Sequence, residues 1–167
     1  MTRTLKFLIL PTLFLGLMFI YGCPLDMNFP PDKPGSKHID EALLGTWHCV
    51  NDTCNDLQVV LVEKEDDYTY AIEVKEKGED YMVDAVTFSG YVTEIDGKKF
   101  LYARGNEMDT YFTYHYQVSG KKLSIYDVGL LVGGKEAVTS TEAFRAEISA
   151  SLKKEDCLRE RLDFVRK

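Results

Sequence analysis

The stretch YVTEIDGKKFLYAR, residues 91–104, decides the fold class of this 167-residue chain. Its Asp96-Gly97 pair separates two runs that are rich in aromatic and β-branched residues. An Asp-Gly pair in that setting predicts a two-residue hairpin turn. We therefore expect a strand over Tyr91–Ile95 to pair with a strand over Lys98–Arg104.

Runs of alternating apolar and polar residues flank this hairpin on both sides and predict further strands. The clearest are Tyr68–Val74 before the hairpin and Tyr111–Val118 after it. Gly90 marks a bulge or bend that could divide one strand into two, so seven or eight strands precede residue 127. The remaining predicted strands are Thr46–Val50, Leu57–Glu63, Tyr81–Ser89 and Lys122–Tyr126. Short connections favour an antiparallel meander, which hides its edges best by closing into a barrel of about eight strands.

One helix is expected near the C-terminus. Thr139 and Glu142 have the spacing of a capping box. Apolar residues then recur at helical spacing, as Phe144, Ile148 and Leu152. This stripe predicts a helix that packs on the outside of the barrel or across one of its ends. A final strand is expected over residues 161–167.

The N-terminus has the layout of an export signal. Arg3 and Lys6 precede an apolar run from Phe7 to Tyr21, which contains no charge. The run is shorter than the roughly 20 residues of a spanning helix, although a permanent anchor helix is the alternative. The sequence thus predicts a signal peptide over residues 1–22.

The end of this signal resembles the lipobox of bacterial lipoproteins, carried by Ile20-Tyr21-Gly22-Cys23. Tyr21 departs from the pattern, where a small residue is usual. The resemblance implies that Cys23 is lipidated and that the protein is exported and anchored to a membrane of the bacterial cell envelope; an ordinary disulfide at Cys23 is the alternative. The Pro- and Asp-rich residues 23–37 are predicted to be a flexible tether, with the folded domain over residues 38–167.

Composition limits the partners. The whole chain has a net charge of −7, and the signal carries two positive charges, so the mature chain has −9 (−7 − 2). This acidity argues against a nucleic-acid partner. Cys49, Cys54 and Cys157 are disulfide candidates whose pairing the sequence leaves open. No metal-ligand spacing is found, and no cofactor is expected.

The first predicted strand opens with Leu44-Gly45-Thr46-Trp47, which resembles the Gly-x-Trp signature of the lipocalin-like superfamily. The resemblance covers roughly residues 41–167 and implies that Gly45 and Trp47 form the barrel floor. It also implies that a late arginine, Arg166 or Arg161, lies over the Trp47 ring. No second lipocalin signature is present, and Trp47 as a plain core aromatic is the alternative.

Three functions are considered. The first is a non-enzymatic binding module for a small hydrophobic ligand, with Tyr70, Asp84, Tyr114 and Tyr116 as candidate binding residues on inward faces. The tyrosines could equally fill the core. The second is an envelope-structural or protein-interaction lipoprotein with an envelope protein as partner, including the hydrolase-inhibitor type.

The third function is an enzyme, for which Glu63, Asp84, His115 and Asp127 are the acid–base candidates. Asp84 shares strand parity with apolar neighbours, and burial would raise the pKa of its carboxyl group. No nucleophile elbow, phosphate loop or metal pair is found, so the sequence predicts that the protein is not an enzyme.

Overall fold

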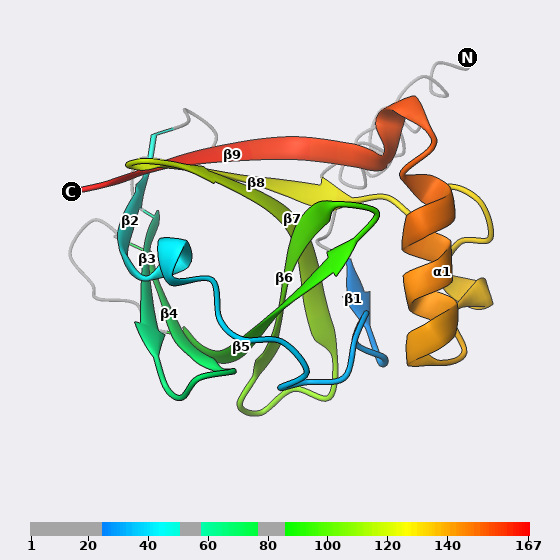
Figure 1. Cartoon of the computed structure of the whole chain (residues 1–167), viewed down its shortest axis with the longest axis horizontal. Coiled ribbons are helices and arrows are strands. Elements are labelled where there is room, and N and C mark those ends of the chain that lie inside the picture. The colour runs from blue at the N-terminus through cyan, green and yellow to red at the C-terminus, as the bar shows by residue number, and fades with distance from the viewer. Residues whose placement is uncertain (1–24, 51–57, 77–85) are drawn as a thin grey trace, which may run out of the picture.

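The computed structural model describes residues 25–50, 58–76 and 86–167 (Figure 1). It is mainly β, with one α-helix, α1 (Thr141–Ser151), in this described part. Short 3-10 helices cover Glu41–Leu43 (η1), Lys135–Ala137 (η3) and Glu155–Cys157 (η4). The strands are β1 (Asp26–Met27), β2 (Gly45–Cys49), β3 (Gln58–Lys64), β4 (Tyr70–Glu76), β5 (Val86–Ile95), β6 (Lys98–Gly105), β7 (Tyr111–Ser119), β8 (Lys122–Val128) and β9 (Leu158–Arg166).

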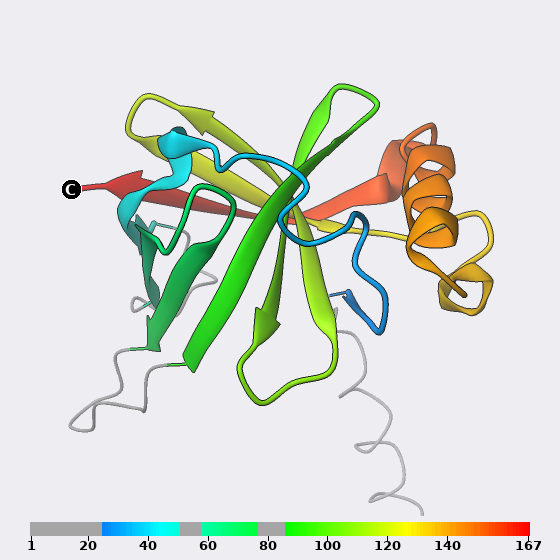
Figure 2. The same ribbon diagram turned by 60° about the horizontal axis from the view of Figure 1, so that its bottom comes forward.

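Strands β2 to β9 form a closed eight-stranded antiparallel barrel, which confirms the predicted fold class (Figure 2). The predicted hairpin is present, with Ile95 opposite Lys98 across the Asp96-Gly97 turn. Strand β9 closes the ring because it pairs with β2 on one side and with β8 on the other. Each of these eight strands is therefore paired along both of its edges, which removes the open edges of a simple meander.

Strand β1 lies outside the ring and pairs with the start of β7. Leu25, Met27 and Pro31 are buried, and Asp32 accepts a hydrogen bond from the Thr93 hydroxyl at 2.6 Å. The flexible tether predicted for residues 23–37 is therefore corrected: the folded part begins no later than Leu25, not near His38. The reason is that a few scattered apolar residues complete a core to which the barrel and helix α1 also contribute.

One end of the barrel is closed by η1 and by the predicted floor residues Gly45, Trp47 and Arg166. Trp47 is fully buried, and its indole Nε1 donates to the Leu43 carbonyl at 2.7 Å. The Arg166 guanidinium lies 4.3 Å from the centroid of the Trp47 ring, as expected. Gly45 has a φ of 127°, and a Cβ there would lie 3.4 Å from the Arg166 side chain. We call this end the plugged end and the other the opposite end.

Helix α1 packs by the predicted apolar stripe, but its cap is one residue later than expected. Ser140, not Thr139, is the N-cap, and its hydroxyl accepts from the Ala143 amide at 3.1 Å. Phe144 and Ile148 are fully buried. They belong to a second core cluster with Leu25, Met27, Ile95, Phe100, Val128, Val138 and Cys157. This cluster joins the helix and β1 to the outside of the barrel (Figure 1).

Gly90 does not divide its strand, because β5 runs unbroken through it and keeps its register with both neighbouring strands. A Cβ at Gly90 would lie 2.4 Å from the Ile72 Cδ1, so close packing explains the glycine. Strand β9 begins at Leu158, three residues before the expected start. Of the strand predicted over residues 81–89, positions 81–85 lie outside the described residues.

Four other predictions concern positions outside the described residues: the signal peptide over 1–22, Cys23 with its lipobox, Cys54 and Asp84. Cys157 is buried and free, which leaves Cys49 and Cys54 as the remaining disulfide candidates. In the described part of the chain, no helix has the length and hydropathy needed to cross a membrane.

Candidate functional site

Two of the predicted binding tyrosines form hydrogen bonds at the plugged end of the barrel. Tyr70 and Tyr116 are both buried and belong to the core inside the barrel. The Tyr70 hydroxyl accepts from the Asp40 amide at 2.5 Å, and the Tyr116 hydroxyl donates to Asp40 Oδ2 at 3.0 Å. Lys99 Nζ binds the same carboxylate oxygen at 2.7 Å. These hydroxyls hold the segment before η1 in place, and neither tyrosine lines the pocket described below.

Tyr114 lies on the same face of β7 but nearer the opposite end, where its Cα partner in β8 is Asp127. Burial raises the pKa of the Tyr114 hydroxyl, and the Asp127 charge adds to this shift. Of the predicted binding residues that the structure describes, Tyr114 is thus the one that lies opposite Asp127.

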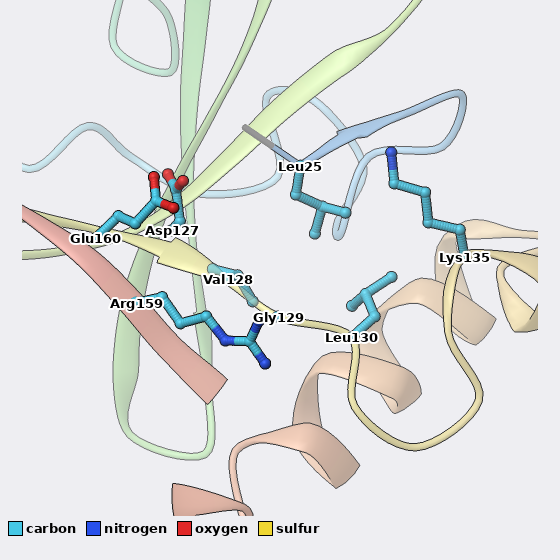
Figure 3. Close-up of a pocket in the computed structure, with 8 residues that line it drawn as sticks. All are labelled: Leu25, Asp127, Val128, Gly129, Leu130, Lys135, Arg159 and Glu160. Atoms are coloured by element: carbon cyan, nitrogen blue, oxygen red, sulfur yellow. The ribbon is translucent and has the colours of Figure 1, made fainter. Parts of the chain in front are cut away.

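A pocket of about 260 Å³ opens where β8 leaves β7 (Figure 3). The pairing of β7 with β8 ends at Tyr114 and Asp127. Before that point β1 takes the place of β8, and the Thr113 amide donates to the Leu25 carbonyl at 3.3 Å. The pocket is lined by Leu25, Asp127, Val128, Gly129, Leu130, Lys135, Arg159 and Glu160.

Two carboxylates, Asp127 and Glu160, form the acidic side of the pocket and lie next to each other (Figure 3). Burial, the charge of Glu160 and a hydrogen bond to Glu160 together raise the pKa of Asp127 from 3.8 to about 6. Asp127 was one of the acid–base candidates, whereas no pattern in the sequence selected Glu160.

A β-bulge brings the two carboxylates together. The register between β8 and β9 shifts between Ile125 and Asp127, so that two steps along β8 match three along β9. Glu160 lies within this shift and has a φ of 46°. A non-glycine residue in that region costs roughly 1 kcal/mol or more, and such strain is concentrated at functional sites.

The basic residues of the pocket already have partners. Lys135 Nζ lies 2.8 Å from Asp26 Oδ1, which ties η3 to β1. The Arg159 Nε donates to the Asp156 carbonyl at 2.7 Å. Both cations are therefore engaged away from the two carboxylates of the pocket.

The apolar wall, formed by Leu25, Val128 and Leu130, is supported by a buried carboxylate. Glu147 of α1 accepts from the Val132 and Gly133 amides at 3.0 and 2.9 Å. These hydrogen bonds help to lower the pKa of Glu147 against the opposing effect of burial. The loop that follows β8 is thus fixed to the helix, so the pocket wall is preformed.

The other described acid–base candidates lie elsewhere. Glu63 is exposed on β3. His115 is buried on the outer face of β7, where its Nδ1 lies 2.9 Å from the Lys99 carbonyl oxygen and its ring stacks on Tyr126. Burial lowers the pKa of His115. Neither residue lines the pocket with Asp127.

No group of three or more potential metal ligands is found among the residues that the structure describes. The chain matches no protein-family model, no curated protein and no solved structure. The interpretation of the pocket therefore rests on its own chemistry.

Proposed function

We propose that this chain is a bacterial envelope lipoprotein, anchored through a lipid on Cys23, whose lipocalin-like barrel acts as a non-enzymatic binding module. The observation that carries the proposal is the pocket at Asp127 and Glu160, which combines a preformed apolar wall with an acidic pair. Concave sites with mostly apolar walls and a few convergent polar groups are the usual form of small-molecule sites.

The pocket supports a small amphipathic ligand. Its volume of about 260 Å³ lies just below the roughly 300–1,000 Å³ of typical ligand pockets. Leu25, Val128 and Leu130 would contact the apolar body of the ligand, while the carboxylates would receive an amine or another hydrogen-bond donor. A cation between two carboxylates relieves their mutual repulsion, so an amine is favoured over a neutral or anionic group.

Binding is favoured over catalysis by the kinds of side chain that line the pocket. The lining side chains that carry functional groups are two carboxylates, one lysine and one arginine. Of the acid–base candidates that the structure describes, Asp127 alone is a lining residue, so no nucleophile and base are seen in contact there.

The proposal is tested with the mature chain, residues 23–167 with Cys23→Ser, titrated with n-hexylamine, n-hexanol and hexanoate. Methyl NMR signals of Leu25 and Leu130 report on binding. We expect hexylamine to bind at least about tenfold more tightly than hexanoate, because the acidic pair attracts one and repels the other. Binding of hexylamine should weaken below pH 6, where Asp127 takes up a proton.

The matched variants are Asp127→Asn, in the pocket, and Glu155→Gln, an exposed acidic residue that does not line it. The first should reduce the preference for the amine, because only the Glu160 carboxylate then remains, and the second should leave it unchanged. If none of the three probes shifts the Leu25 and Leu130 signals, the pocket is not a ligand site.

The lipid anchor is tested in the full chain by membrane fractionation. Cys23→Ser should release the protein from the membrane, because a lipid on this residue supplies the attachment. Membrane retention of the variant with an uncleaved N-terminus would instead support the spanning helix.

We also propose a disulfide between Cys49 and Cys54. The support is that Cys157, the third candidate, is free and lies in the second core cluster beside α1. Non-reducing peptide mapping should give a linked Cys49–Cys54 peptide and one thiol that reacts only after unfolding. A peptide that links Cys157 to either residue would contradict this pairing.

A further inference from the structure

Four of the five exposed large apolar side chains in the described part of the chain lie in or next to connections at the opposite end of the barrel. Val50 follows β2 and is 55% exposed, Val86 begins β5 and is 46% exposed, and Met108 lies in the β6–β7 connection and is 42% exposed. Val132, 57% exposed, lies in the connection that leaves this end after β8, where its amide is bonded to Glu147 of α1. We call these four residues the apolar rim.

The plugged end differs. Of the large apolar residues that are exposed in the described part of the chain, Tyr68 is the one outside the apolar rim, and its ring stacks on His38 at 4.5 Å. Connections of an antiparallel barrel alternate between its two ends, so separate connections contribute to the apolar rim without being neighbours in sequence. Scattered apolar residues are normal on a surface, whereas their concentration at one end marks a contact with a partner or a membrane.

The chain enters the fold at this same end. Leu25 is buried beside the start of β7, and Asp26 and Met27 pair with that strand. Cys23 is two residues earlier in the sequence, and two residues span at most about 7 Å. A lipid on Cys23 therefore holds the opposite end close to the bilayer surface, unlike the long tether that the sequence predicted.

We propose that the opposite end of the barrel faces the bilayer, that the apolar rim enters the lipid interface, and that the pocket beside Leu25 opens toward the lipids. The ligand then reaches the pocket from the membrane, as an amine-bearing amphiphile. This inference rests on the proposed function, because it needs the lipid on Cys23. It goes beyond that function by assigning an orientation and a source for the ligand.

The exposed charges that the structure describes near the rim are nearly balanced, which favours apolar contact over electrostatic attraction. Lys75, Arg104, Arg159 and Arg161 are exposed near this end, and so are Glu107, Asp109 and Glu160. Since the mature chain is acidic overall, anionic lipids offer it no advantage. We therefore expect the same orientation on zwitterionic vesicles and on vesicles with added phosphatidylglycerol.

The test uses the full lipidated chain in phosphatidylcholine vesicles that carry a nitroxide lipid quencher. A bimane label is placed at Met108→Cys or Val132→Cys in the apolar rim, or at Lys121→Cys, which is exposed in the β7–β8 turn at the plugged end. We expect about threefold stronger quenching at the two rim positions than at Lys121. Side chains at the interface enter about 5–10 Å into the boundary between headgroups and acyl chains, where the quencher is.

A second variant pair tests whether the apolar rim itself makes the contact. Val86→Ser with Met108→Ser should weaken quenching of the Val132 label, whereas Tyr68→Ser, the matched change at the plugged end, should not. Equal quenching at Lys121 and the rim positions would overturn the proposal.

The two proposals fail in different ways. A chain that is retained by its lipid but shows no rim quenching overturns the orientation and leaves the binding module intact. Quenching at the rim, together with no binding of hexylamine, hexanol or hexanoate in the pocket, overturns the binding module alone. Loss of lipidation at Cys23 would overturn both the anchor and the orientation.

Discussion

Replacing Asp127 by asparagine should stabilise the protein at neutral pH, although it removes a residue of the proposed site. Burial and the neighbouring Glu160 raise the pKa of the Asp127 carboxyl from 3.8 to about 6 in the folded state. Between these two values the folded chain holds a proton that the unfolded chain has released. Stability therefore falls as the pH rises through this window, and the loss is complete above about pH 6.

The structure sets the size of this effect. A shift of roughly two pH units corresponds to about 3 kcal/mol for a fully buried group. Asp127 is only half-buried, so solvent screening reduces the expected cost to about 1 kcal/mol. The asparagine side chain stays neutral at every pH, and its amide can donate to Glu160. The Asp127→Asn variant should be about 1 kcal/mol more stable at pH 7.5 and equal to the parent at pH 3.5.

Urea unfolding of the mature chain with Cys23→Ser at these two pH values measures the difference, and Glu155→Gln provides the exposed acidic control. The same free-energy gain at both pH values, or no gain at pH 7.5, would refute the account of the acidic pair. The two like charges of the proposed site therefore lower the stability of the ligand-free protein, as groups at functional sites often do.

Three other substitutions test the fold, each by urea unfolding of the mature chain with Cys23→Ser. Arg166→Ala should cost about 1–2 kcal/mol and red-shift the fluorescence of Trp47, because the guanidinium covers the ring; unchanged fluorescence would contradict the floor arrangement. Tyr116→Phe should cost about 1 kcal/mol through the lost bond to Asp40, with hexylamine affinity unchanged; a loss of affinity would return this tyrosine to the ligand site. Met27→Ser should cost about 1.5–3 kcal/mol, since Met27 is buried, whereas a flexible tether predicts no change.

Local patterns in the sequence predicted most of the barrel. The alternation in Tyr111–Val118 and the Asp96-Gly97 turn each depend on a few neighbouring residues, and both were confirmed. The stacking of Arg166 on Trp47 was also predicted, because a short motif and a late arginine are visible in sequence. Errors occurred where local signals compete, as at Thr139 and Ser140, either of which can cap a helix.

The candidate site was mostly not predictable, because its parts come from distant segments. Leu25 and Met27 lie in no periodic pattern, since a two-residue strand is too short to show one. Glu160 reads as an ordinary solvent-exposed charge in a run of charged residues. Asp127 was a candidate, but nothing local showed that its partner would be an acidic residue 33 positions later.

The sequence by itself determined that the chain forms a β-meander with one amphipathic helix, because strand alternation and turn chemistry are properties of neighbouring residues. The tertiary structure alone decided which tyrosines serve the plug and where β1 replaces β8 along β7. It also decided that a bulge places Glu160 beside Asp127. These features depend on strand register and barrel closure, and register is set by packing between segments far apart in the chain.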